Sequence, residues 1–125
     1  MTIHELILGI CARPEMWFGR QGLELTFAFL EGFDYAEARN RPTGEPTDLT
    51  WFRWWLAERL YRSRGMPRNT GAYYYVKALY PDDEEAFAEL PKLYEEFLEW
   101  DRTRYDWVVP QLATFRERAD NANAE

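Results

Sequence analysis

The side chains most capable of chemistry in this chain are one histidine, one cysteine and several carboxylates. His4 and Cys11 are the only residues of their kinds, and on one helix they would lie about 10 Å apart along the axis. This separation exceeds hydrogen-bond reach, so the two cannot form a local nucleophile–base pair. A zinc site would have to rely on carboxylates, which is atypical. We therefore expect no catalytic residue, no metal site and no cofactor.

Carboxylates provide the second chemical option, because four of them fall close together in segment 23–40: Glu24, Glu31, Asp34 and Glu37. Two carboxylates can divide acid and base work when burial raises the pKa of one. The structural alternative is that they form the solvated edge of a helix and pair with neighbouring arginines. An enzyme or ligand-binding domain would use Glu31 and Asp34 near a pocket formed by Met16 and Trp17, and this remains an alternative function.

Acidity is concentrated in one part of the chain. The 125 residues carry a net charge of −7, but residues 82–101 alone hold nine acids against Lys92 and sum to −8. Residues 53–68, in contrast, hold five arginines against Glu58 and sum to +4. An acidic total argues against nucleic acid as a direct partner, because phosphate binding requires a dominant basic face.

The elements that must position these groups are predicted to be helices. Thr2 begins a capping-box pattern with Glu5 and opens a first helix to about Cys11. Segment 23–40 is apolar around nearly the whole helical wheel, which predicts a buried central helix. Thr47 or Asp48 can cap the next helix, whose core stripe consists of Leu49, Phe52, Leu56 and Leu60.

The remaining segments complete an all-α prediction. Residues 72–80 have mixed strand and helix propensity, and we favour a short helix. The acidic segment 82–101 forms a helix that Pro91 should kink or split. Residues 107–118 make a last helix, and 119–125 should fray. We expect one compact domain, residues 1–118, of five to six helices around the buried second helix.

The stretch "RPEMWFG" at residues 13–19 is predicted to be an interhelix corner. Pro14 should end the first helix. Met16, Trp17 and Phe18 would then fill the gap between helices, and Gly19 would turn the backbone with a positive φ.

Four pieces of the chain together resemble a family of small acidic bacterial immunity proteins of polymorphic toxin systems. They are "RPEMWFG" (13–19), "LELTFAFLEGFDYA" (23–36), "WFRWWLAERL" (51–60) and "DDEEAFAELPKLYEEFL" (82–98). The sequence departs from the family pattern at Glu15, where a Gly is usual, at Trp17, where a Tyr is usual, and at Pro91. The resemblance implies a helical protein that binds a cognate protein toxin and occludes its active site without performing a reaction.

The acidic segment provides the candidate binding surface for such a partner. Its glutamates follow three- and four-residue steps, which aligns them on one helix face: Glu85, Glu89, Glu96 and Glu99, with Glu95 alongside. We expect Tyr74, Trp54 and Trp100 to act as aromatic anchors beside it. The alternatives are that the face is merely solvated, that it pairs with the arginines of the third helix, or that exposed aromatics pair in a homodimer.

The sequence also predicts where the protein works. The N-terminus has no basic region or small-residue cleavage site typical of a signal peptide. No stretch approaches the roughly 20 apolar residues of a membrane span. We therefore expect a soluble cytoplasmic protein without a membrane partner.

Overall fold

Six helices form between Ile3 and Leu98: α1 (Ile3–Ala12), α2 (Pro14–Phe18), α3 (Gly22–Asn40), α4 (Asp48–Arg64), α5 (Ala72–Leu79) and α6 (Asp83–Leu98). The computed structural model describes residues 1–18, 22–40, 44–101, 113–114, 116–118 and 120–121. No strand occurs in these residues, so the all-α prediction is confirmed. The short helix predicted at 72–80 is confirmed as α5.

Local chemistry explains where the helices begin and end. The Thr2 side chain accepts a hydrogen bond from the Glu5 amide at 3.1 Å, and the Thr47 hydroxyl accepts one from the Thr50 amide at 3.3 Å. These side chains satisfy amides that have no partner within the helix. Gly65 ends α4 in the left-handed region with φ 67°, a conformation that glycine adopts at little cost.

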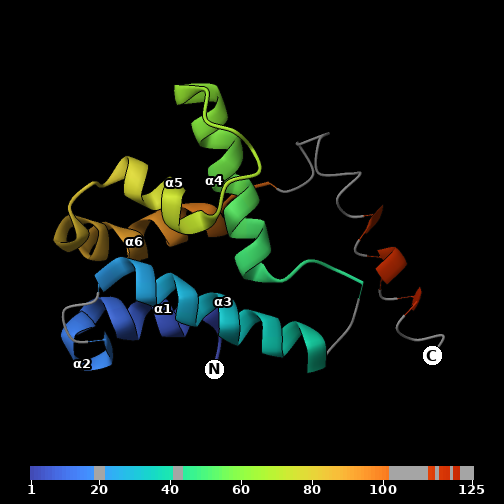
Figure 1. The fold of residues 1–125 in the computed structure, drawn as a ribbon, viewed down its shortest axis with the longest axis horizontal. Coiled ribbons are helices and arrows are strands. Elements are labelled where there is room, and N and C mark those ends of the chain that lie inside the picture. The colour runs from blue at the N-terminus through green and yellow to red at the C-terminus, as the bar shows by residue number, and fades with distance from the viewer. Residues whose placement is uncertain (19–21, 41–43, 102–112, 115, 119, 122–125) are drawn as a thin grey trace.

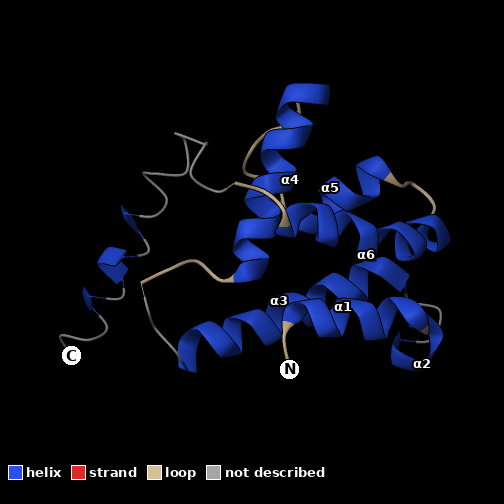
Figure 2. Ribbon diagram, turned by 180° about the vertical axis from the view of Figure 1, so that it is seen from behind, coloured by secondary structure: helices blue, strands red, loops and turns tan. Residues whose placement is uncertain are grey.

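The helices are arranged in two pairs crossed by α4. In both views α1 and α3 lie below α5 and α6, while α4 stands upright and its C-terminal end projects beyond the others (Figures 1 and 2). Helix α6 packs against α1, α3, α4 and α5. Phe52 of α4 is fully buried and contacts Tyr94 and Phe97 of α6, with ring centroids 5.0 and 5.4 Å apart. Helix α4 is therefore pinned to α6 by aromatic packing.

Helix α3 differs from the buried central helix that was predicted. One side of it is buried, through Leu23, Thr26, Phe27 and Leu30. Leu25 and Phe29 on the other side are 40% and 39% exposed. Apolar composition around the whole wheel predicted burial on all sides, but described elements cover only one side of this helix.

Pro91 does not split the acidic helix, since α6 runs continuously from Asp83 to Leu98. Proline removes one backbone hydrogen bond. Leu90, directly before it, and Leu93, two positions after it, are both buried in the same core. Packing on both sides of the proline therefore holds the two halves of α6 in one helix.

The predicted corner is a short helix, α2, that begins at Pro14. Met16 is 70% exposed, so its predicted burial is wrong. It points outward and contacts the Arg13 guanidinium through its sulfur at 3.8 Å. The side chains of Trp17 and Phe18, and Gly19 itself, lie outside the described residues.

The C-terminal predictions lie largely outside the described residues. Residues 113–114 and 116–118, which belong to the predicted last helix, are helical, as are 120–121 in the segment expected to fray. Across the part of the chain that the structure describes, no helix has both the length and the hydropathy to cross a membrane.

Candidate functional site on the outer face of α6

The acidic side chains of α6 lie opposite its buried side. The buried side consists of Ala86, Phe87, Leu90, Leu93, Tyr94 and Phe97. With 100° between successive residues, this places Glu85, Glu95 and Glu99 on the far side of the helix and Glu89 and Glu96 on its flank. Glu85, Glu95, Glu96 and Glu99 are exposed, and Glu89 is half-buried. We call these five residues the acidic face.

Two members of the acidic face pair within the protein. Glu96 meets Arg59 of α4 at 3.2 Å, and Glu89 lies 3.7 Å from Lys92 on the same helix. The side chains of the other three, Glu85, Glu95 and Glu99, make no hydrogen bond or ion pair within the described residues. Pairing with the arginines of α4 therefore accounts for Glu96 alone.

Tyr80 stands beside the acidic face, and sequence reasoning missed it. Partial burial raises the pKa of its phenol, and the negative charge of Glu89 raises that pKa further, while Arg59 opposes both effects. Its hydroxyl thus stays protonated and can donate a hydrogen bond at neutral pH. The only signal available in the sequence was its position just before the acidic segment.

Trp55 forms a second aromatic border near the same surface. The Arg59 guanidinium lies over its ring, 5.5 Å from the centroid, and Trp55 is half-buried. Because Arg59 also pairs with Glu96, it connects the Trp55 ring to the acidic face. Trp55 and Tyr80 therefore border the acidic face, where the sequence predicted Tyr74, Trp54 and Trp100 as the aromatic anchors.

Of the three predicted anchors, only Tyr74 is well exposed, at 61%. Trp54 is 4% exposed, so its predicted surface position is wrong. It packs edge-on against Trp51 with ring centroids 5.2 Å apart. Trp54 lies off the main apolar stripe of α4, but it is buried because α4 packs against α3, α5 and α6 on several sides. Trp100 is half-buried against Trp51 and Phe97.

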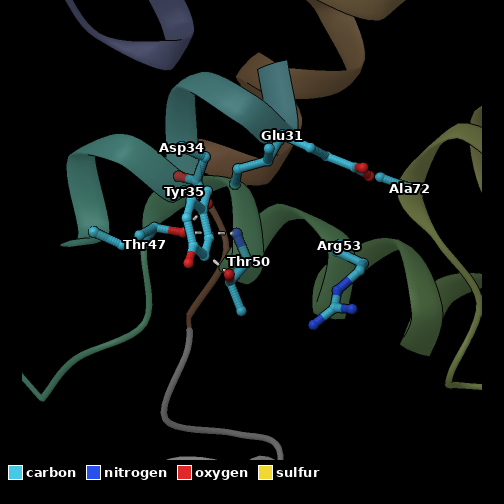
Figure 3. A pocket seen from close by; sticks show the side chains of 9 residues that line it. Glu31, Asp34, Tyr35, Thr47, Thr50, Arg53 and Ala72 are labelled. Carbon is cyan, nitrogen blue, oxygen red and sulfur yellow. Dashed lines mark hydrogen bonds between the residues drawn. The ribbon is translucent and has the colours of Figure 1, made fainter. Parts of the chain in front are cut away.

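The alternative site, at Glu31 and Asp34, lies in a cavity of about 370 Å³ between α3 and α4 (Figure 3). The Thr47 hydroxyl donates a hydrogen bond to Asp34 at 2.7 Å. Partial burial raises the pKa of Asp34, and the hydrogen bond from Thr47 opposes that rise. Arg53 also lines the cavity, and Figure 3 shows its guanidinium well apart from the Asp34 carboxylate.

Met16 does not belong to this cavity. It is carried by α2, next to the N-terminal end of α3, whereas Asp34 lies about 18 Å further along α3. The predicted combination of Asp34 with a Met16 pocket is therefore wrong. The cavity wall comes instead from α4 and the residue before it, including Leu49, Thr50 and Thr47.

The remaining candidates for chemistry are structural. His4 stacks on Tyr94 with ring centroids 5.3 Å apart. Burial raises the pKa of the Cys11 thiol to about 12, so at neutral pH it is not a nucleophilic thiolate. No group of three potential metal ligands occurs within the residues described.

Comparison of the chain with protein-family models, with curated proteins and with solved structures finds no match.

Proposed function

We propose that this protein is an immunity-type binding protein that neutralises a protein toxin with the acidic face of α6. One observation carries the proposal: Glu85 and Glu95 of α6 and Glu99 at its C-cap are exposed and make no ion pair within the described residues. Carboxylates that contribute little to the fold are available to a partner. The resemblance of four segments to immunity proteins supports the same function.

The geometry of the acidic face suits a basic cleft. Glu85 and Glu99 are about 21 Å apart along the helix axis, and a carboxylate recurs at nearly every turn between them. Many toxins act on nucleic acids or nucleotides, and their active sites are basic. A rigid row of negative charge would steer this protein to such a cleft and raise the association rate.

Neighbouring groups can strengthen the contact once the partner has docked. Tyr80 offers a hydroxyl donor and Trp55 offers a flat ring, both at the border of the acidic face. Aromatic side chains of this kind often supply much of the binding energy at interfaces. The protein would then act by occlusion and perform no reaction of its own.

The test is protection of cells from the toxin domain encoded beside this protein. The variant Glu85→Lys/Glu95→Lys/Glu99→Lys should slow association by at least about tenfold and abolish protection. The control variant Glu15→Lys/Glu117→Lys/Asp120→Lys changes three other exposed acids and alters the net charge by the same amount. Full protection by the first variant, or equal loss in both, would show that the acidic face is not the binding surface.

A small-ligand-binding domain is the second candidate function, favoured by the cavity between α3 and α4. Its volume of about 370 Å³ lies at the lower end of the range for ligand sites. Asp34 and Arg53 would hold opposite charges of a ligand. Ligand-observed NMR with small amino acids should detect binding to the wild-type protein that Asp34→Asn and Arg53→Met each remove. Binding by both variants at the wild-type level would count against this site.

A further inference from the structure

Helix α3 carries an exposed seam of seven residues on the side opposite its buried one. All seven are exposed, and three are large hydrophobic residues: Leu25 at 40%, Phe29 at 39% and Tyr35 at 68%. They follow alternating steps of three and four residues, which keeps them on one side of the helix. We define the α3 seam as Leu25, Ala28, Phe29, Gly32, Tyr35, Ala36 and Arg39.

The seam is symmetric about Gly32. The inner residues at equal distances before and after it match in size: Ala28 and Ala36 lie four positions away, and Phe29 and Tyr35 lie three positions away. An antiparallel copy of α3 crossing at Gly32 would therefore place alanine on alanine and aromatic ring near aromatic ring. Both kinds of pairing are favourable for close helix contact.

Gly32 itself has no packing role within the described residues. A Cβ built at this position would have no atom within 4 Å, yet glycine inside a helix costs about 1 kcal/mol relative to alanine. A second helix that crosses closely at Gly32 would use the space that the missing side chain leaves.

Charge selects the antiparallel orientation. Glu24 and Arg39 lie about 22 Å apart along the axis and cannot meet within one helix. Neither makes an ion pair within the described residues. In the antiparallel register Glu24 of each copy lies next to Arg39 of the other, giving two equivalent pairs. A parallel register would instead bring like charges together.

We propose that α3 is a homodimer interface, in which two copies cross antiparallel at Gly32 and are related by a two-fold axis. The second copy covers Leu25 and Phe29, which described elements leave exposed. One helix pair buries less than the about 1,200 Å² of a standard interface. The dimer is therefore reversible and depends on protein concentration.

Disulfide trapping tests the register directly. In a Cys11→Ala background, Gly32→Cys places the two introduced thiols at the crossing point, so mild oxidation should convert most of the protein to a covalent dimer. Asn40→Cys is the matched control, because this exposed residue of α3 leaves Glu24 and Arg39 in place and its two copies lie about 24 Å apart in this register. Failure of Gly32→Cys to cross-link, or equal cross-linking by Asn40→Cys, would overturn the proposed crossing.

Sedimentation velocity with charge reversals tests the pairing. The wild-type protein should pass from monomer to dimer as the concentration rises through the micromolar range. Glu24→Arg and Arg39→Glu should each weaken the dimer by about tenfold, and the double variant should restore it. A protein that stays monomeric at every concentration, or a double variant that is no better than the single ones, would overturn the proposal.

Discussion

Glu58 of α4 and the glutamates of α6 are the same kind of side chain in opposite situations. Glu58 is 2% exposed, and its two oxygens face Arg62 Nε at 2.5 Å and Arg68 Nε at 3.4 Å. Glu85, Glu95 and Glu99 are exposed and lack such partners within the described residues. A carboxylate that is surrounded by its own fold supports stability, whereas one left in water is available for recognition.

Asp83, in the first turn of α6, is the intermediate case. One of its oxygens meets Lys77 Nζ at 2.5 Å, and the other accepts a hydrogen bond from the Leu23 amide of α3 at 3.3 Å. It thereby ties three helices together while its side chain is still 42% exposed. These three situations predict a graded series of effects on the free energy of unfolding.

The largest effect is expected when the buried carboxylate loses its partners. The double variant Arg62→Met/Arg68→Met removes both ion-pair partners of the buried Glu58 carboxylate, which should lower the free energy of unfolding by about 3 kcal/mol. Urea denaturation measures this change in the free energy of unfolding. Arg118→Met, at an exposed position, should change it by less than about 0.5 kcal/mol. A similar small change in the double variant would show that Glu58 does not depend on its arginines.

The contact between α3 and α6 should be the next most sensitive. Gly22 has φ 68°, and a Cβ there would collide with the Asp83 carboxylate. Gly22→Ala should therefore cost about 2 kcal/mol. Gly32→Ala, within the same helix but in open space, should instead stabilise the monomer by about 0.5–1 kcal/mol. Equal effects at the two glycines would contradict the close approach at Gly22.

Asp83→Asn should have a smaller and pH-dependent effect. The hydrogen bond from Lys77 holds the pKa of Asp83 below its usual value of 3.8; partial burial opposes this and the Leu23 amide reinforces it. A lowered folded-state pKa stabilises the protein above 3.8, and the contribution disappears as the pH falls through the folded-state value. Asparagine keeps an oxygen that can accept from the Leu23 amide, so the variant loses mainly the charged hydrogen bond to Lys77. For a pair this exposed, the loss should cost at most about 1 kcal/mol at neutral pH.

Urea titrations of the wild type and Asp83→Asn at neutral pH and well below pH 3.8 measure this linkage. The difference between the two proteins should be present at neutral pH and vanish at acidic pH. A difference that stays constant across the range would show that the ionised carboxylate is not responsible.

The smallest effect on stability is expected at the acidic face. Glu85→Lys/Glu95→Lys/Glu99→Lys should change the free energy of unfolding by less than about 0.5 kcal/mol per residue, because these side chains are exposed and unpaired within the described residues. Thermal melts measured beside the partner-binding assay would separate the two roles. A large loss of stability would mean that these glutamates support the fold after all.

Rules that depend on a few neighbouring residues predicted the helices well. Thr2 and Thr47 cap helix starts through their side chains, each where the sequence predicted a cap, and Gly65 ends α4 through its backbone conformation. These interactions span only three to five residues. They can therefore be recognised in the sequence without knowledge of the packing.

Positions that depend on other helices were predicted less well. Trp54 is buried because α4 meets several neighbours, and Met16 is exposed because α2 turns it away from the core. Asp34 of α3 accepts a hydrogen bond from Thr47, 13 residues later at the start of α4, so this contact depends on how the two helices pack. The burial of Glu58 was also not predicted, although Arg62 four positions later is a local sign of pairing.

The hydrogen bond between Leu23 and Asp83 joins residues 60 positions apart. During synthesis at about 5–20 residues per second, Asp83 is added about 3–12 seconds after Leu23. During that interval the first turn of α3 lacks the Asp83 carboxylate that accepts a hydrogen bond from the Leu23 amide. The N-terminal end of α3 can therefore reach its final hydrogen bonding only after α6 has been synthesised.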